Sequence, residues 1–286
     1  MKLIRFGSRG NEKPGVLLDG IRYDCSAYFE DWNREFFLGK GLEKLAEVVE
    51  AGKNKLPQVP DHERWSSCVA RPNMILCIGL NFSDHAAESG MEPPKEPILF
   101  MKATNTLSGP YDEVSIPKGS SKTDWEVELA FVLKRDVLYL ESEAEAAEAI
   151  GGYFIMNDIS EREFQVERGG QWVKGKSCPG FSPAGPWMVT PEEIADFNDL
   201  KMQLWVDGEQ MQNGNSGTMI FKPAFLVHYI SQFMKLEAGD IITTGTPPGV
   251  GLGMKPPQYL KPENVVRLSI EGLGQQEQKF VKYQKQ

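Results

Sequence analysis

Residues 123–133, TDWEVELAFVL, alternate in polarity in the way that is typical of a buried β-strand. One face carries apolar side chains, namely Trp125, Val127, Leu129, Phe131 and Leu133. The other face begins with Glu126 and Glu128 and ends with Ala130 and Val132. Because a strand rises about 3.3 Å per residue, the two carboxylates lie roughly 7 Å apart on one face. The segment therefore predicts a strand with two like charges at the start of a face that becomes buried.

A pair of buried carboxylates needs a partner, because burying one unpaired carboxylate already costs several kcal/mol. Such a pair shares a proton or binds a cation. A third acid, Asp158, follows the next apolar strand, GGYFIMNDIS (151–160). If the two strands are neighbours, three carboxylates converge, and oxygen ligands suit Mg²⁺, Mn²⁺ or Ca²⁺ better than Zn²⁺ or copper. The alternative is that Glu126 and Glu128 lie on the solvated face of an edge strand and that Asp158 starts a turn.

The charge of the chain restricts its partners. Its 286 residues have a formal net charge of −9, which argues against nucleic acid or an anionic membrane, because both attract clustered Lys and Arg. The sequence starts without the apolar core of a signal peptide, and no stretch approaches the ~18 apolar residues needed to span a bilayer. We therefore expect a cytoplasmic protein whose four scattered cysteines are reduced.

The pattern of elements predicts a mixed α/β, β-rich fold with largely antiparallel sheets. Residues 1–70 are expected to form a small N-terminal α/β domain, with a hairpin turn at Asp19-Gly20 and a helix over 41–52. Residues 71–286 are expected to form the main domain, in which strands dominate and helices are expected in 141–152 and 221–234. The sequence has no dinucleotide-binding fingerprint and no phosphate-binding P-loop, so neither a nicotinamide cofactor nor a nucleoside triphosphate is expected.

One of the three histidines is a candidate general base. His85 lies in GLNFSDHAAESG (79–90), directly after a predicted buried strand. If the segment forms a short helix, Glu88 lies three residues on and on the same face, where its carboxylate can orient the imidazole to activate water. The alternative is an incidental ion pair on a surface turn. His62 and His228 are expected to be structural or solvated.

Further polar side chains follow the third carboxylate and a late strand. Residues 157–187 contain Arg162, Gln165 and Lys176 among glycines that leave room for a ligand, although ordinary surface charge is the alternative. The segment GDIITTGTPPGVG (239–251) offers hydroxyl and backbone N–H donors to a carboxylate, or forms only a rigid hairpin.

In this order, the segments from about residue 72 to residue 272 resemble the fumarylacetoacetate hydrolase superfamily. The resemblance rests on several motifs: CIGLNFSDHAAE (77–88), PILFMKATNTLSGP (97–110), DWEVELAFVL (124–133), GGYFIMNDISEREFQ (151–165), QWVKGKS (171–177) and GDIITTGTPPGVG (239–251). It implies a roll of antiparallel and mixed sheets, preceded by a small N-terminal domain, and a homodimer or higher homo-oligomer.

The resemblance also implies roles for individual residues. It assigns binding of Mg²⁺, or of Mn²⁺ or Ca²⁺, to Glu126, Glu128 and Asp158. It assigns water activation to His85 and Glu88, and the stabilisation of developing negative charge to Lys176. The substrate contacts that it implies are Lys102, Arg162, Gln165 and Thr246.

The activity that the resemblance implies is hydrolysis of the C3–C4 bond of a 2,4-dioxo acid to pyruvate and a carboxylic acid. Residues 167–189 are similar to the branch that hydrolyses 2,4-diketo-3-deoxy-fuconate or -rhamnonate, which would release lactate. Decarboxylation of a 2-oxo acid such as oxaloacetate and isomerisation or hydration of a 2-oxo-dienoate are alternatives. A catalytically silent ligand-binding protein on the same fold is another.

Overall fold

The computed structural model describes residues 1–52, 55–84, 92–194 and 196–285. Its described part contains a ten-stranded mixed sheet, a five-stranded sheet and a pair of short strands. The path of the large sheet runs through β3 (Ile21–Asp24), β2 (Lys13–Leu18), β1 (Lys2–Phe6), β12 (Ser182–Val189), β10 (Ile150–Asn157), β9 (Val127–Leu133), β15 (Ile241–Thr243), β4 (Ile75–Gly79) and β5 (Ile98–Lys102), with β6 (Leu107–Ser108) paired to β12.

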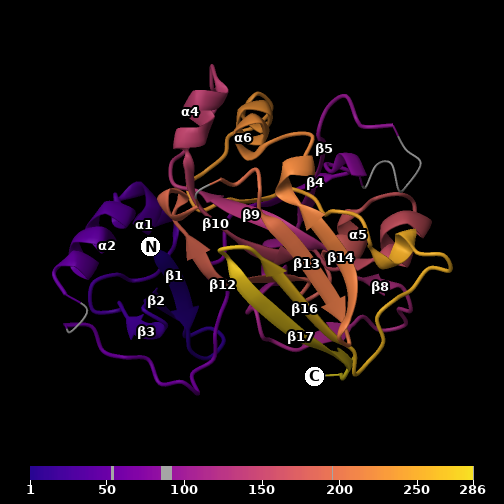
Figure 1. Ribbon diagram of the computed structural model, residues 1–286, viewed down its shortest axis with the longest axis horizontal. Helices are drawn as coiled ribbons and strands as arrows, with labels where there is room; N and C mark the ends of the chain where they lie inside the picture. Colours follow the sequence, from indigo (N-terminus) through magenta and orange to yellow (C-terminus); the bar gives the residue numbers. More distant parts are fainter. Residues whose placement is uncertain (53–54, 85–91, 195, 286) are drawn as a thin grey trace.

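The smaller sheets and the helices complete the fold (Figure 1). The five-stranded sheet has the order β14 (Glu209–Asn215), β13 (Lys201–Val206), β16 (Val265–Ile270), β17 (Gly274–Lys282) and β7 (Val114–Ile116), and the pair consists of β11 (Ser160–Glu161) and β8 (Thr123–Asp124). The described α-helices are α1 (Arg34–Leu38), α2 (Gly41–Glu50), α4 (Glu143–Glu148), α5 (Val173–Lys176) and α6 (Pro223–Ser231). Short helical turns lie at η2 (Thr104–Thr106), η3 (Glu163–Glu167), η4 (Pro191–Glu193), η5 (Ser216–Thr218) and η6 (Gly251–Gly253), of which η3 is a π-helix.

The predicted β-rich, mixed α/β fold is confirmed. Most pairings in the large sheet are antiparallel, whereas β15 pairs in parallel with β4 and β6 pairs in parallel with β12. Among the described helices, none is long and apolar enough to cross a bilayer.

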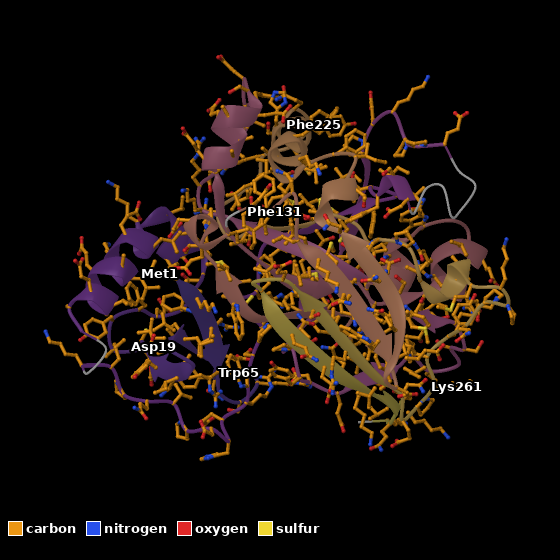
Figure 2. All side chains as sticks on the ribbon, viewed as in Figure 1. Met1, Asp19, Trp65, Phe131, Phe225 and Lys261 are labelled. Carbon is orange, nitrogen blue, oxygen red and sulfur yellow. The ribbon has the colours of Figure 1, made fainter. Side chains whose placement is uncertain are left out.

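Strand β9 lies in the interior of the large sheet, between β10 and β15, and all of its residues are buried. The side chains of its two faces join different apolar clusters. Leu129 and Phe131 pack in a cluster with residues of the five-stranded sheet and α6, whereas Ala130 and Val132 pack with α1, α2 and the N-terminal strands. Phe131 is labelled in Figure 2. The predicted alternation is confirmed, and the interpretation of this segment as a solvated edge strand is wrong.

The N-terminal segment is joined to the large sheet. The predicted turn at Asp19-Gly20 connects β2 to β3, and the positive φ angles of 50° and 80° at these two residues are those of a type I′ hairpin. Strand β1 pairs with β12, so β1–β3 extend the sheet that contains β9 (Figure 1). The proposed boundary between residues 70 and 71 stays a prediction.

Candidate active site

The register of β9 and β10 brings three carboxylates together. Glu128 lies opposite Met156 in this antiparallel ladder, and two residues further on the amide of Asp158 donates to the carbonyl oxygen of Glu126 at 3.0 Å. Side chains of opposed residues lie on the same face of a sheet. One carboxyl oxygen from each of Glu126, Glu128 and Asp158 therefore lies within 4.8 Å of the others, and all three residues are buried. The expected convergence of these side chains is confirmed, while their role as metal ligands stays a proposal.

Three cations surround two of the carboxylates. The ammonium of Lys176 lies 2.7 Å from Glu126 Oε2 and 2.6 Å from Asp158 Oδ2. The guanidinium of Arg162 donates to Glu126 Oε1 at 2.6 Å. Lys102, which is fully buried, donates to Asp158 and to two backbone carbonyl oxygens. These cations stabilise the ionised carboxylates, because each ion pair offsets the cost of burial.

The environment of Glu126 differs from that of Glu128. Burial raises the pKa of Glu126, but the charges of Lys176 and Arg162 outweigh burial and bring the pKa to about 2. Glu128 makes no ion pair in the described part of the chain, and it accepts a hydrogen bond from the amide of Gly245 at 3.1 Å. Burial, followed by the charges of Asp158 and Glu126, raises its pKa well above the ordinary value. Within the part of the chain that the structure describes, Glu128 is therefore the one of the three carboxylates that lacks a counterion.

The cluster fits a divalent cation in both its charge and its donors. Among the described residues, the three cations Lys102, Lys176 and Arg162 pair with Asp124, Glu126 and Asp158, and Glu128 adds a fourth buried carboxylate to the cluster. Full ionisation leaves an excess negative charge that a cation would neutralise. The three convergent donors are carboxylate oxygens, which hard divalent ions prefer.

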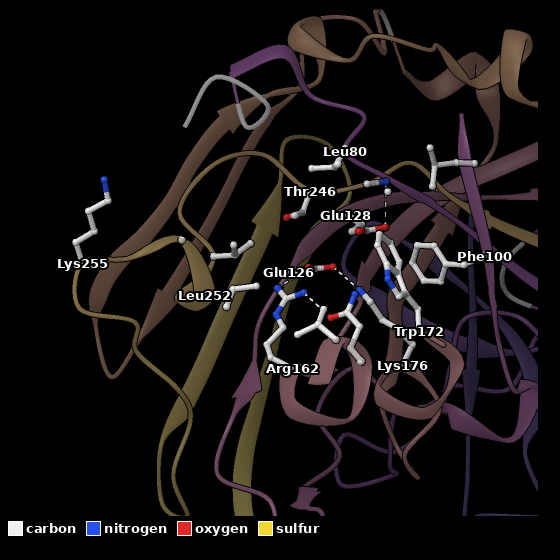
Figure 3. A pocket seen from close by; sticks show the side chains of 17 residues that line it. Leu80, Phe100, Glu126, Glu128, Arg162, Trp172, Lys176, Thr246, Leu252 and Lys255 are labelled. Carbon is white, nitrogen blue, oxygen red and sulfur yellow. Dashed lines mark hydrogen bonds and ion pairs between the residues drawn. The ribbon is translucent and has the colours of Figure 1, made fainter. Parts of the chain in front are cut away.

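A pocket of about 610 Å³ opens above the carboxylates (Figure 3). Its size is within the range of about 300–1,000 Å³ for small-molecule sites. The polar lining includes Glu126, Glu128, Arg162, Gln165, Lys176, Thr246 and Lys255, and the apolar lining includes Ile78, Leu80, Phe100, Trp172, Val250 and Leu252. The rings of Phe100 and Trp172 pack edge to face, with their centroids 5.1 Å apart, and form an aromatic wall beside the carboxylates.

Local backbone geometry positions two of the pocket groups. Gly245 has a φ of +87°, which favours glycine, and this conformation aims its amide at Glu128. Gly175 precedes Lys176 on α5, and a Cβ atom there would lie 2.4 Å from the carbonyl oxygen of Glu161. Glycine at 175 therefore lets α5 pack closely enough for Lys176 to reach the carboxylates.

The structure places the expected substrate contacts in different surroundings. Arg162 and Gln165 both line the pocket and are joined by a hydrogen bond of 3.0 Å. Thr246 also lines it, but its hydroxyl donates to the carbonyl oxygen of Val127 at 2.9 Å. Lys102 is absent from the described lining, and its ammonium is engaged with Asp158 and carbonyl oxygens. The substrate-binding roles of these residues stay predictions.

The predicted dyad of His85 and Glu88 lies outside the described residues. The chain that leads to it is anchored near the carboxylates. The side-chain amide of Asn81 donates to the carbonyl oxygens of Thr244 at 2.8 Å and Phe221 at 2.9 Å. Residue 81 is thus tied to the end of β15, beside Gly245.

Sequence reasoning missed Asp124, a fully buried carboxylate that accepts a hydrogen bond from Arg162 Nε at 2.8 Å. A signal for it was present, because Asp124, Glu126 and Glu128 alternate with apolar residues in the segment 123–133. It also missed Phe100 and Trp172, since no spacing rule predicts which aromatic side chains line a pocket.

Comparison with known proteins supports the same family. Residues 74–281 match the family described as fumarylacetoacetate (FAA) hydrolase, C-terminal. A Burkholderia multivorans protein named "Putative hydrolase" is 50% identical over 278 residues, covering 96% of this chain and 97% of that protein. The solved fumarylacetoacetate hydrolase of Exiguobacterium antarcticum is 32% identical and covers 99% of this chain and 100% of its own, with a TM-score of 0.85.

Two other solved structures differ in their stated activities. The maleylpyruvate hydrolase of Sphingobium sp. SYK-6, in complex with manganese(II) and pyruvate, is 24% identical, with a TM-score of 0.81 and coverage of 99% and 100%. The 2-hydroxyhepta-2,4-diene-1,7-dioate isomerase of Mycobacterium marinum is 26% identical, with a TM-score of 0.75 and full coverage of both chains, at 100% each. The extent of the match over residues 74–281 and the identity to the bacterial relatives establish that this chain belongs to the fumarylacetoacetate hydrolase family.

Proposed function

We propose that the protein is a divalent-metal-dependent hydrolase that cleaves the C3–C4 bond of a 2,4-dioxo acid and releases pyruvate and a carboxylic acid. The observation that carries the proposal is the convergence of Glu126, Glu128 and Asp158 within 4.8 Å at a pocket where, among the described residues, Glu128 makes no ion pair. A divalent cation held by these residues would polarise the 2-oxo acid and lower the energy of the departing enolate.

Lys176 is proposed to stabilise negative charge that develops on the substrate. Burial lowers the pKa of its ammonium, but the charges of Asp158 and Glu126 outweigh burial, and the pKa lies above the ordinary value. The side chain is therefore charged at neutral pH and lines the pocket. A fixed positive charge in a site that excludes water stabilises an oxyanion without reorganisation of solvent.

Gln165 and Arg162 are proposed to orient the 2-oxo acid. The guanidinium of Arg162 donates to Gln165 Oε1, which fixes the amide so that its NH₂ group is the remaining donor towards the pocket. Thr246 is proposed to contact the substrate with its backbone and methyl group, because its hydroxyl already donates to the carbonyl oxygen of Val127.

His85, oriented by Glu88, is proposed to take the proton of the attacking water. The position of Leu80 in the pocket lining and the bond from Asn81 to Thr244 support this assignment, because the histidine follows Asn81 by only four residues in the sequence. Hydroxide adds to the C4 carbonyl, the electrons of the C3–C4 bond pass to C3 as the enolate of pyruvate, and protonation of that enolate gives pyruvate.

A 2,4-diketo-3-deoxy sugar acid is the proposed substrate. Its acyl portion would be a lactoyl group, whose methyl could meet the aromatic wall of Phe100 and Trp172. The stated ligands of the maleylpyruvate hydrolase from Sphingobium make Mn²⁺ a suitable test ion beside Mg²⁺, although that likeness concerns the fold alone. We further propose that the protein acts in the cytoplasm as a homodimer, which sedimentation of the purified protein would test.

Isomerisation is the competing activity, because solved structures of the same fold include the isomerase from Mycobacterium marinum. Incubation of several 2,4-dioxo acids in H₂¹⁸O separates the reactions. Hydrolysis incorporates one ¹⁸O atom into the carboxylic acid and releases an equal amount of pyruvate, whereas isomerisation releases neither product and decarboxylation releases CO₂. Turnover without labelled acid would refute hydrolysis.

A further inference from the structure

Asp124 lies beside the carboxylates and accepts hydrogen bonds from several parts of the chain. The residue is fully buried, and Oδ2 accepts from Arg162 Nε at 2.8 Å and from the amide of Leu252 at 3.0 Å. Oδ1 accepts from the amides of Trp125 at 2.8 Å and Gly251 at 2.7 Å. Four donors thus fix one carboxylate, as a buried charge requires.

Two of these hydrogen bonds attach Asp124 to a segment that lines the pocket. The segment that includes η6 contributes Val250 and Leu252 to the pocket lining. A Cβ atom on Gly251 would lie 2.8 Å from Asp124 Oδ1, so glycine permits this approach. The neighbours of Asp124 reinforce the attachment, because the indole of Trp125 donates to the carbonyl oxygen of Gly249 at 3.1 Å.

Asp124 also determines how Arg162 meets Glu126. The guanidinium divides its donors, with Nε on Asp124 at 2.8 Å and Nη2 on Glu126 at 2.6 Å. Without the charge of Asp124, Arg162 would interact with Glu126 alone, and its positive charge would neutralise that carboxylate more completely. A carboxylate that is neutralised in this way attracts a cation less strongly.

We propose that Asp124 is a positioning residue that fixes Arg162 against Glu126 and thereby raises the affinity of the carboxylate cluster for a divalent cation. This inference rests on the proposed function, because it assumes that Glu126, Glu128 and Asp158 bind the cation. Asp124 itself is not one of the three convergent donors. Its effect passes through Arg162, which makes the inference testable by a double-mutant cycle.

The experiment measures the Kd of the full chain for Mn²⁺, from the electron paramagnetic resonance signal of the free ion. Asp124→Asn is expected to raise the Kd by about 10–100-fold, the usual effect of removing a residue that orients a metal ligand. In an Arg162→Gln background the same substitution should change the Kd by no more than about 2-fold, because the residue through which it acts is gone. An equal effect in both backgrounds, or none in either, would overturn the proposal.

Asp112→Asn is the matched control. Asp112 is also a buried carboxylate, bonded to Arg64 at 2.7 Å and 2.6 Å, but neither residue lines the described pocket. Its substitution should leave the Kd for Mn²⁺ unchanged, and an effect as large as that of Asp124→Asn would show that any buried Asp–Arg pair acts through stability alone and would overturn the proposal.

Two outcomes separate this inference from the proposed function. A wild-type protein that binds no Mn²⁺ would refute both, whereas tight binding by the wild type and by Asp124→Asn alike would refute only the role of Asp124. If Asp124→Asn does not fold, the double variant, in which both buried charges are removed, is compared with Arg162→Gln. A Kd that differs between these two by 10-fold or more would contradict action through Arg162.

Discussion

Substitution of Glu128 by Gln should separate metal binding from stability. Gln has nearly the shape of a protonated Glu, and it keeps a carbonyl oxygen that can accept the hydrogen bond from Gly245. Burial and the charges of Asp158 and Glu126 raise the pKa of Glu128 well above its ordinary value, so the metal-free site favours the neutral form of this side chain, which Gln imitates. The metal-free variant should therefore match the wild type in free energy of unfolding to within about 1 kcal/mol, the usual size of a single neutral hydrogen bond.

The effect on metal binding follows from the spacing of the carboxylates. Two ionised groups 4.8 Å apart interact by about 3.5 kcal/mol at an effective dielectric constant of 20. A cation among the three carboxylates is attracted by the Glu128 charge with an energy of the same order. Each 1.4 kcal/mol corresponds to about a factor of ten in Kd, so an energy of about 3.5 kcal/mol exceeds two factors of ten, and loss of this charge should weaken binding by at least about 100-fold.

Urea unfolding with EDTA and with Mn²⁺ measures this difference. At a free Mn²⁺ concentration of about 100 times the wild-type Kd, the wild type should gain about 2.7 kcal/mol, whereas Glu128→Gln should gain about 0.4 kcal/mol. Asp112→Asn, outside the pocket lining, should gain as much as the wild type. Equal gains for Glu128→Gln and the wild type would refute the assignment of Glu128 as a ligand.

Three further substitutions test the surroundings of the site. Burial raises the pKa of Asp112, but hydrogen bonds from Arg64 outweigh burial and hold the pKa below its ordinary value. Asp112→Asn should therefore lower the free energy of unfolding by about 1–3 kcal/mol at pH 7, as measured in urea. The difference in stability between variant and wild type should disappear only as the pH falls through that lowered pKa. A loss that stays constant from pH 7 to pH 3 would contradict this. Lys102→Met should destabilise the protein by about 3–5 kcal/mol, because it takes a counterion from Asp158; an altered KM with unchanged unfolding would favour a substrate contact instead. Trp172→Ala should raise KM by about 10-fold through lost apolar contact and leave the Kd for Mn²⁺ unchanged; a changed Kd would contradict the separation of wall and metal site.

The central strand and its carboxylates could be predicted from the sequence because their signals are local. The period-two pattern over 123–133 fixes which side chains share a face, and Asp158 directly follows the next strand and is bonded to the backbone of Glu126. Antiparallel pairing of consecutive strands then suffices to bring the three acids together.

The remaining parts of the site depend on contacts that are distant in the sequence. Lys102 follows an apolar run, and no pattern near it in the sequence predicts that its ammonium pairs with Asp158, 56 residues away. The pairing of β1 with β12 joins segments about 185 residues apart, as in the match of Leu3 with Met188, and no local pattern predicts such a partner.

The most direct test of the central claim is pyruvate release from a 2,4-dioxo acid by protein that has been stripped with EDTA. We predict no release from the stripped protein and full recovery on addition of Mn²⁺ or Mg²⁺. Glu128→Gln should recover only at about 100-fold higher metal concentration, in line with its lost charge. Full activity of the stripped wild type would contradict metal-dependent hydrolysis at Glu126, Glu128 and Asp158.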